Sequence, residues 1–285
     1  MSVVQLIRAG TLDAELAGLL WLMVEARVPL VVAAGPRLAG KTTILTALLE
    51  FLPPNAAIRQ LDGYAEEFEW LPEAARLGWR APHAAAAAPP PPALPAPITP
   101  ATGYLVAGEL SPHLPSYTWG EQARIAIRAL SLGYGLGTTT HANSLEELFD
   151  ELRTPDIRLT DDELSHLGVV LILRAFHDER GEVIRRIEAA HYIRPVSRDS
   201  GGHVQRLRPA VLAIWDPGRD AFEHFAWGVT PELATRVGRR PGDFEAEQGR
   251  RRDVLAALAA AGVESFADVR SAIDGYRLAA TLHRH

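Results

Sequence analysis

The feature that most constrains the fold is a glycine-rich loop between a short apolar segment and an amphipathic one. Residues 30–34 are apolar throughout and are bounded by Pro29 and Gly35, which is typical of a buried parallel strand. After the loop, apolar residues recur at helical spacing over residues 44–52, until the Pro-Pro pair at 53–54 stops the pattern. The sequence therefore predicts a strand, a glycine loop and a helix in this order.

The loop fits the pattern G-x-x-x-x-G-K-[ST], whose glycines let backbone N–H groups turn toward a phosphate. Lys41 can supply charge to the β and γ oxygens of a nucleotide, and the Thr42 hydroxyl can hold Mg²⁺. Lys41 is the only lysine among 29 basic residues, and arginine is not equivalent to lysine at a phosphate site. We expect a bound nucleoside triphosphate, with a tight turn without ligand as the alternative. The expected nucleotide-binding residues are Gly35, Pro36, Arg37, Leu38, Ala39, Gly40, Lys41, Thr42 and Thr43.

Three carboxylates and one histidine are candidates for the chemistry at this site. Glu109 follows an apolar strand, so it can hold Mg²⁺ through water or polarise an attacking water. Asp62 and Glu66 follow a weaker strand and could face the same edge, although ordinary surface carboxylates are an equally good reading. His141 ends a third strand in the segment GTTTHANS, where it could contact the γ-phosphate, while Asn143 or Ser144 caps the next helix.

Periodicity predicts an α/β fold with a mostly parallel sheet and crossover helices, because strand and helix patterns alternate through the first half of the chain. Turns at 178–181 and 216–219 predict two added antiparallel hairpins. We expect one domain over 1–230 and a C-terminal helical subdomain over 231–285. The expected helices are 11–27, capped by Thr11, then 42–52, 119–132 and 144–152; the expected strands are 30–34, 57–61, 104–107, 135–140, 169–176, 183–193, 211–215 and 221–227.

Composition excludes several classes of protein. The net charge of −6 and the pI near 5.9 leave no basic footprint, so direct nucleic-acid binding is not expected. The apolar stretch 16–34 carries Glu25 and Arg27, so it predicts no transmembrane segment. With no cysteine and no secretory signal pattern, the chain is expected in the cytoplasm.

Two biased segments remain. Residues 81–101 hold 9 Ala and 8 Pro among 21 residues, which predicts a surface loop inserted in the domain. Arginines at 236, 239, 240 and 250–252 are expected on solvated helix faces, and we assign them no role.

On these motifs the chain resembles the type II/IV secretion ATPase family, the motors of pili, the archaellum and DNA-transfer machines, and is most similar to its archaeal GspE-like branch. The resemblance implies a RecA-like, usually hexameric P-loop ATPase that uses ATP and Mg²⁺, with a membrane platform protein as partner at the inner face of the membrane. It implies Walker A roles for Lys41 and Thr42, a Walker B role for Glu109 and a histidine-box role for His141. The likeness rests on these segments: LIRAGTLDAELAGLLWLMVEARVPLVVAAGPRLAGKTTILTALLEFLPP, YLVAGEL, GTTTHANSLEELFDEL, LGVVLILRAFHDERGEVIRRIEAAHYI and RRRDVLAALAAAGVESFADVRSAI.

The chain departs from the family pattern at several points. The acidic box offers only Asp62 and Glu66, in LDGYAEEF, where the family has a Glu-Asp pair and a later Glu. The family arginine after Walker B is missing from GELSPH, and the expected Gly-His is Gly133-Tyr134. The Pro/Ala run replaces an arginine-bearing segment, and we expect this motor to lack the family's usual N-terminal domain, which often contributes arginines. Since arginine contacts can contribute factors of about 10³ to 10⁵ to phosphoryl transfer, we expect nucleotide binding with slow hydrolysis.

Two functions of different class follow. The first is an assembly motor in which hydrolysis drives rigid-body motion. The second is a regulatory paralogue that binds ATP and a partner but turns over little. A P-loop kinase acting on a small molecule is weaker, because the sequence shows no acceptor pocket and the His141 segment fits kinases poorly.

Overall fold

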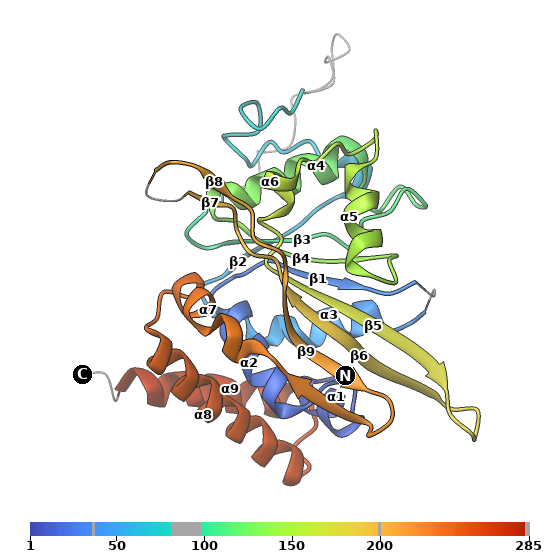
Figure 1. Cartoon of the computed structure of the whole chain (residues 1–285), viewed down its shortest axis with the longest axis vertical. Coiled ribbons are helices and arrows are strands. Elements are labelled where there is room, and N and C mark those ends of the chain that lie inside the picture. Colours follow the sequence, from blue (N-terminus) through green and yellow to red (C-terminus); the bar gives the residue numbers. More distant parts are fainter. Residues whose placement is uncertain (36–37, 81–97, 199–200, 283–285) are drawn as a thin grey trace.

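A mixed eight-stranded sheet organises the chain (Figure 1). The computed structural model describes residues 1–35, 38–80, 98–198 and 201–282. The sheet has the strand order β10-β9-β6-β5-β1-β4-β3-β2. Its strands are β1 (Leu30–Ala33), β2 (Ala57–Gln60), β3 (Gly103–Val106), β4 (Gly135–Thr140), β5 (Val169–His177), β6 (Val183–Tyr192), β9 (Ala210–Asp216) and β10 (Ala221–His224); β7 (Ser197–Arg198) and β8 (Val204–Gln205) form a separate pair.

The described helices are α1 (Val3–Arg8), α2 (Ala14–Glu25), α3 (Lys41–Leu48), α4 (Gly120–Ala129), α5 (Leu145–Arg153), α6 (Asp161–Leu164), α7 (Thr230–Arg236), α8 (Pro241–Ala260) and α9 (Phe266–Leu282). Helices alternate with strands only in the central part of the chain, where α3, α4 and α5 follow β1, β3 and β4. Short 3₁₀ turns follow α3 and α4. Among the described helices, none is long and apolar enough to cross a membrane.

The sheet has a parallel part and an antiparallel part. From β2 through β3, β4 and β1 to β5 every pairing is parallel, whereas β5, β6, β9 and β10 pair antiparallel. The prediction of an α/β fold with a mostly parallel sheet and added hairpins is therefore confirmed. The central strand β1 is buried along its whole length between β4 and β5, which explains its unbroken apolar sequence.

The two faces of β1 contribute to two separate hydrophobic clusters. Val32 packs with α2, α3 and the C-terminal helices, whereas Val31 and Ala33 pack with α4 and α5. This division follows from the period of two along a strand. Figure 1 shows the same layers, with α4, α5 and α6 on one side of the sheet and α1, α2 and α3 on the other.

The helix expected over residues 11–27 is α2, and it begins later than expected, at Ala14. Asp13, and not Thr11, caps α2, because the Asp13 carboxylate accepts a hydrogen bond from the Leu16 N–H at 2.9 Å. Thr11 is needed elsewhere, since its carbonyl accepts a hydrogen bond from the Ile187 N–H of β6 at 2.8 Å. The short helix α1, which has its own capping box from Ser2 to Gln5, was not predicted.

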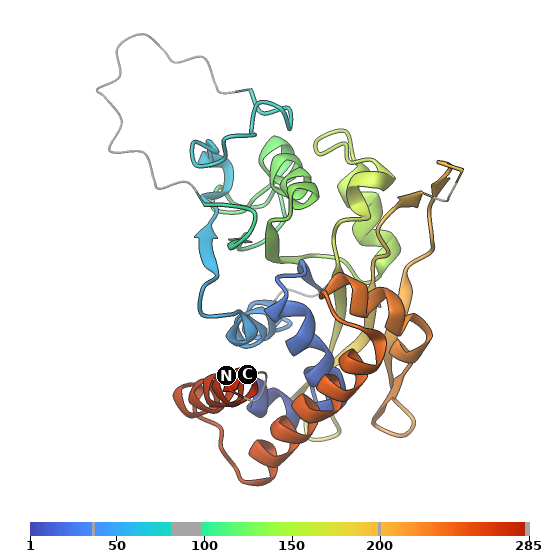
Figure 2. The ribbon, with the colours of Figure 1, turned by 90° about the vertical axis from the view of Figure 1, so that its left-hand side faces the viewer.

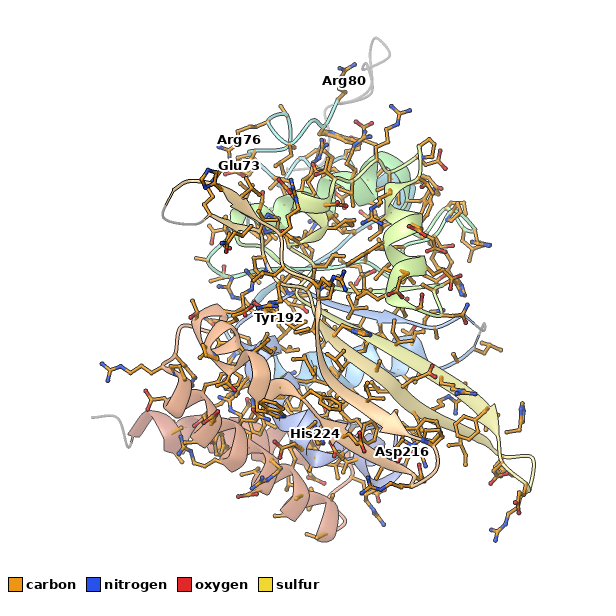
Figure 3. All side chains as sticks on the ribbon, viewed as in Figure 1. Glu73, Arg76, Arg80, Tyr192, Asp216 and His224 are labelled. Carbon is orange, nitrogen blue, oxygen red and sulfur yellow. The ribbon has the colours of Figure 1, made fainter. Side chains whose placement is uncertain are left out.

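Side-chain contacts tie the antiparallel strands to the start of α2. His224, labelled in Figure 3, is the last residue of β10 and pairs with Ala213 of β9, and its Nε2 is 2.8 Å from Asp13 Oδ2. Burial by itself would lower the pKa of His224. The hydrogen bond to Asp13 and the negative charge of Asp13 outweigh burial, so the pKa of His224 is raised. The Asp13 carboxylate therefore both caps α2 and holds β10.

The C-terminal helices lie alongside the N-terminal ones, and α8 packs against α2 (Figures 1 and 2). Gly18 permits this close approach, because a Cβ there would lie 2.9 Å from the Arg252 backbone nitrogen. These helices share the hydrophobic cluster of α2 and α3. The division at residue 230 stays a prediction.

One arginine of the C-terminal cluster contradicts the expectation of solvated faces. Arg251 is 3% exposed, and its Nε lies 3.0 Å from Glu247 Oε1. It also pairs with Glu25 of α2, and its guanidinium carbon lies 4.8 Å from the centre of the Trp21 ring. The expectation was wrong for Arg251 because a run of charges does not reveal which member turns toward the neighbouring helix.

The Pro/Ala segment, which was expected to form a surface loop, lies outside the described residues over 81–97.

Candidate functional site

The glycine loop joins the end of β1 to the start of α3, in the order predicted. Gly40 precedes α3 with φ of +98°, a backbone conformation that favours glycine, and no side chain caps the helix. The N-terminus of α3 is therefore open to an anion, which its backbone N–H groups and dipole favour. Leu38 also has positive φ, at 61°, and is 94% exposed. Pro36 and Arg37 lie outside the described residues.

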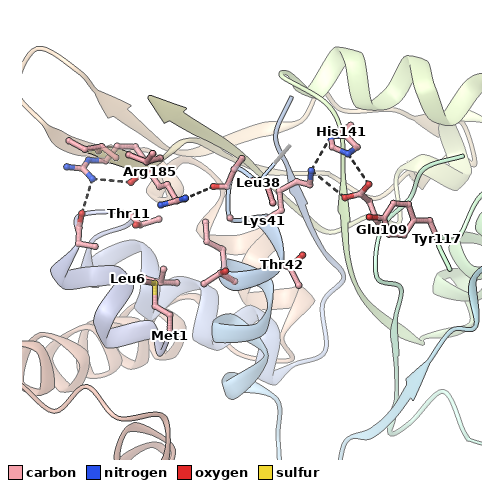
Figure 4. Close-up of a pocket in the computed structure, with 18 of the residues that line it drawn as sticks. Met1, Leu6, Thr11, Leu38, Lys41, Thr42, Glu109, Tyr117, His141 and Arg185 are labelled. Atoms are coloured by element: carbon pink, nitrogen blue, oxygen red, sulfur yellow. Dashed lines mark hydrogen bonds and ion pairs between the residues drawn. The ribbon is translucent and has the colours of Figure 1, made fainter. Parts of the chain in front are cut away.

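A pocket of about 950 Å³ opens over this helix terminus (Figure 4). Its walls come from α1, the glycine loop, the segment after β3, the end of β4 and the start of β6. The residues that line it are Met1, Leu6, Ala9, Thr11, Leu38, Ala39, Gly40, Lys41, Thr42, Thr43, Ile44, Glu109, His113, Leu114, Tyr117, His141, Val183, Ile184, Arg185 and Arg186.

Three predicted residues meet inside this pocket. The ammonium group of Lys41 lies 3.4 Å from Glu109 Oε2 and 3.2 Å from His141 Nδ1. His141 Nε2 in turn lies 3.0 Å from Glu109 Oε1. Lys41 and Glu109 are buried, at 6% and 8% exposure, so their charges attract each other in surroundings of low dielectric.

The tautomer of His141 follows from these neighbours. Lys41 can only donate, so Nδ1 accepts from it and the ring proton sits on Nε2, facing the carboxylate. If Lys41 moved away, a protonated Nδ1 could instead donate to the Gly35 carbonyl oxygen, which lies 3.3 Å away. When Lys41 leaves, His141 Nδ1 can therefore exchange the lysine for the Gly35 carbonyl oxygen as its hydrogen-bond partner.

One carboxylate oxygen of Glu109 remains without a hydrogen bond. Its Oε1 is buried, and the contact with His141 is close but does not have the geometry of a directed hydrogen bond. A buried acceptor in this condition costs free energy unless a ligand or water satisfies it. The atom is therefore suited to bind a water or a group that enters the pocket.

The sheet positions Glu109 and His141 together. Because β3 and β4 are parallel neighbours, the chain leaves both strands at the same edge. Leu110 donates its N–H to the Thr139 carbonyl at 2.7 Å, and the Thr139 hydroxyl donates to the Gly108 carbonyl at 2.8 Å. These bonds on either side of Glu109 hold its backbone against the end of β4.

Gly35 is required by packing at the start of the loop. A Cβ on this residue would lie 1.9 Å from Asn143 Oδ1, and Asn143 is held by a hydrogen bond to Glu147. Ser144, one of the two caps that the sequence predicted, accepts a hydrogen bond from the Glu147 N–H at 3.1 Å and caps α5. Gly35 itself is not among the residues lining the pocket.

Thr42 and Thr43 are exposed in the first turn of α3 and line the pocket. Asp62 and Glu66 do not line it. Asp62 is exposed, whereas Glu66 is buried and accepts hydrogen bonds from the Asp62 and Phe68 N–H groups and from Trp70 Nε1. The structure thus gives the Glu66 carboxylate a local role in holding its own loop.

Several residues of the pocket were not predicted from the sequence. Arg185 of β6 donates its Nε proton to the Ala39 carbonyl at 2.9 Å. His113 is linked to Ser111 by a short hydrogen bond, and its ring centre lies 5.9 Å from that of His141. The pair of adjacent arginines at 185–186, next to Val183 and Ile184, was the one signal that could have pointed to Arg185.

No preformed metal cage is present in the described part of the chain, where no group of three or more His, Asp or Glu side chains could hold an ion by themselves. Mg²⁺ does not need one, because it usually keeps several waters and binds through one or two protein oxygens and the phosphates of a substrate. The Thr42 hydroxyl and the unsatisfied Glu109 oxygen fit that pattern.

Comparison with known proteins finds distant relatives. No protein-family model matches the chain. The chain is similar to the uncharacterized protein MJ0900 of Methanocaldococcus jannaschii, with 26% identity over 280 residues that cover 96% of this chain and 48% of that protein. It is also similar to the uncharacterized protein MJ1287 of the same organism, with 26% identity over 223 residues, or 76% of each chain. The chain thus spans about half the length of MJ0900.

Proposed function

We propose that this pocket binds Mg-ATP and hydrolyses it, as part of a RecA-like P-loop ATPase domain. The observation that carries the proposal is the buried contact of Lys41 with Glu109 at the open N-terminus of α3. A cation, an anion-binding helix terminus and a buried carboxylate in one pocket are the groups that phosphoryl transfer to water requires.

The chain's own groups suggest how a nucleotide enters. Its phosphates lie over the free backbone N–H groups of the first turn of α3, and Lys41 turns from Glu109 and His141 toward the β and γ oxygens. This exchange replaces one anionic partner of the lysine by another. It also leaves Glu109 without its cation, at the moment when its carboxylate is needed as a base.

Glu109 and His141 then act at the terminal phosphate. Glu109 Oε1, which has no hydrogen bond in the described structure, accepts a proton from the attacking water. His141 Nε2 lies beside that carboxylate, and its Nδ1 can turn to the Gly35 carbonyl oxygen once Lys41 has moved to the nucleotide. Thr42 and, through water, Glu109 would hold Mg²⁺, which would supply positive charge against the charge that develops on the phosphates.

At the level of the whole machine, we propose a motor of the type II/IV secretion or pilus-assembly kind. This step rests on the order of motifs along the chain and on the family they resemble. The family resemblance further implies a homo-oligomer, usually a hexamer, that docks on a membrane platform protein from the cytoplasmic side.

The first experiment measures equilibrium binding of a fluorescent ATP analogue with Mg²⁺, together with phosphate release. Lys41→Ala should abolish both signals, and Thr42→Ala should weaken Mg²⁺-dependent binding. Thr46→Ala is the matched control, because Thr46 is exposed one turn further along α3 and outside the pocket. Equal binding and turnover in the wild type and in Lys41→Ala would end the proposal.

A nucleotide-binding regulator with little turnover is the second candidate. Within the described residues, the two arginines that line the pocket contact Ala39 and Asp220, and neither contacts Glu109 or His141. Neither arginine is therefore placed to stabilise negative charge on a terminal phosphate beside Glu109. Tight binding of ATP without measurable phosphate release, and a mass in solution that ATP does not change, would favour this candidate over the motor.

A further inference from the structure

Arg185 stands at the pocket with a guanidinium group that the fold uses only in part. It lies on β6, near the tip of the hairpin that β6 forms with β5. Its Nε donates to the Ala39 carbonyl, which joins the hairpin to the glycine loop. Among the described residues, its terminal nitrogens Nη1 and Nη2 make no hydrogen bond or ion pair.

The neighbouring Arg186 differs from Arg185, because all three of its guanidinium nitrogens make hydrogen bonds within the fold. Arg186 is buried, its Nε and Nη2 lie 2.8 and 2.9 Å from the two Asp220 oxygens, and its Nη1 donates to the Ala9 carbonyl at 2.9 Å. Its hydrogen bonds lower the pKa of Asp220 to about 2. Arg186 is therefore committed to the fold, whereas Arg185 retains donors for a ligand.

The position of Arg185 in the pocket indicates which part of a ligand it meets. Figure 4 shows Arg185 on the side of Thr11 and Leu6, with Glu109 and His141 beyond Lys41 on the other side. If hydrolysis occurs beside Glu109, the terminal phosphate lies at that end. The opposite end then receives the nucleoside and the phosphates next to it.

The glycine loop leaves room for the guanidinium group. A Cβ on Gly40 would lie 2.9 Å from Arg185 Nε and 3.0 Å from its Cδ. Glycine therefore lets the arginine pack on the loop beside the open terminus of α3 without a shift of its side chain. The fork of Arg185 is thus held next to the backbone N–H groups that favour phosphate.

We propose that Arg185 binds the nucleotide phosphates on the nucleoside side, the α- and β-phosphates, from within the same chain. This inference rests on the proposed function. A guanidinium group can bind two phosphate oxygens at once, in a fork geometry that lysine does not reproduce. Because ATP and ADP share these two phosphates, Arg185 contributes to the binding of both.

The test compares dissociation constants of fluorescent ATP and ADP analogues, with Mg²⁺, for wild type, Arg185→Ala, Arg185→Lys and Arg174→Ala. Arg174 lies on the same hairpin, in an exposed ion pair with Glu188, and serves as the matched control. Arg185→Ala should weaken both nucleotides by about 10- to 100-fold, as for loss of a charge-assisted hydrogen bond. Arg185→Lys should recover part of this affinity, and Arg174→Ala should change neither constant.

The catalytic readout sharpens the assignment. For Arg185→Ala the KM for ATP should rise with the loss of affinity, while kcat stays within about threefold, because the residue stands away from the reacting phosphate. A thermal unfolding curve close to that of the wild type shows that the hairpin is intact.

Three results would count against the inference. Unchanged affinity in Arg185→Ala, while Lys41→Ala still abolishes binding, would overturn it and leave the proposed function standing. A loss confined to ATP would place Arg185 at the γ-phosphate and would also overturn it. Absence of nucleotide binding in the wild type would overturn the proposed function, and this inference with it.

Discussion

Lys41 Nζ lies 3.4 Å from Glu109 Oε2, and neither side chain is more than a tenth exposed. The two charges come from the N-terminus of α3 and from the segment after β3, so the pair links the helix to the sheet edge. A buried ion pair of this kind contributes little net stability, but the loss of one partner leaves the other as a buried, uncompensated charge.

This relationship predicts a specific pattern of stability. Lys41→Met should lower the free energy of unfolding by about 3 kcal/mol, because Glu109 loses its cation. The double variant Lys41→Met with Glu109→Gln should recover most of that loss, since no buried charge remains. Urea unfolding of the wild type, Lys41→Met, Glu109→Gln and the double variant measures the energetic coupling between the two side chains. Losses that simply add would show that the pair has no energetic coupling.

Glu109→Gln by itself separates binding from hydrolysis. The amide keeps the shape of the side chain but cannot accept the proton of an attacking water, so phosphate release should fall by about 10² to 10⁴. The affinity for ATP should stay within a few-fold, because Lys41 loses only a competing anion. Asp62→Asn is the control, since Asp62 is exposed and outside the pocket. Unaltered turnover in Glu109→Gln would assign the base elsewhere.

Glu50 predicts a pH dependence of stability. It is 1% exposed, and burial raises its pKa to about 7, against the partial opposition of a hydrogen bond from the Val3 N–H. The folded state therefore holds a proton that the unfolded state releases near the ordinary pKa of 4.5. Stability should fall as the pH rises from about 4.5 to about 7.

Glu50→Gln removes this proton equilibrium. The variant should be more stable than the wild type by about 1–3 kcal/mol at pH 8 and should match it at pH 4.5, as judged by thermal unfolding at both values. Glu67→Gln, at an exposed position, should show no such difference. Equal stabilisation at both pH values would mean that packing, and not ionisation, is responsible.

Arg251 and Arg250 offer a comparison between adjacent arginines. Arg251 is buried among Glu25, Glu247 and Trp21, whereas the Arg250 side chain is 59% exposed. Arg251→Met should cost about 3 kcal/mol, because two acidic partners lose their buried cation. Arg250→Met should cost less than about 1 kcal/mol. Chemical denaturation distinguishes them, and equal costs would contradict the burial of Arg251.

The sequence predicted most of the fold, because strands and helices here have clear periods and their boundaries carry strong signals. A strand over 30–34, the glycine loop and a helix were expected in this order, and Ser144 was one of two expected caps of α5. The cap of α2 was wrongly predicted, since the carbonyl of Thr11 binds a strand far away in the sequence.

What the sequence determined by itself is local: a short buried strand, a backbone that turns with glycine, and one lysine at the start of a helix. The tertiary structure decided which distant groups surround that lysine. Sheet order brings Glu109 and His141 to it and places Arg185 at the other end of the pocket. The reason is that periodicity records which face of an element is buried, whereas contacts between elements depend on strand order and crossing, which no local pattern encodes.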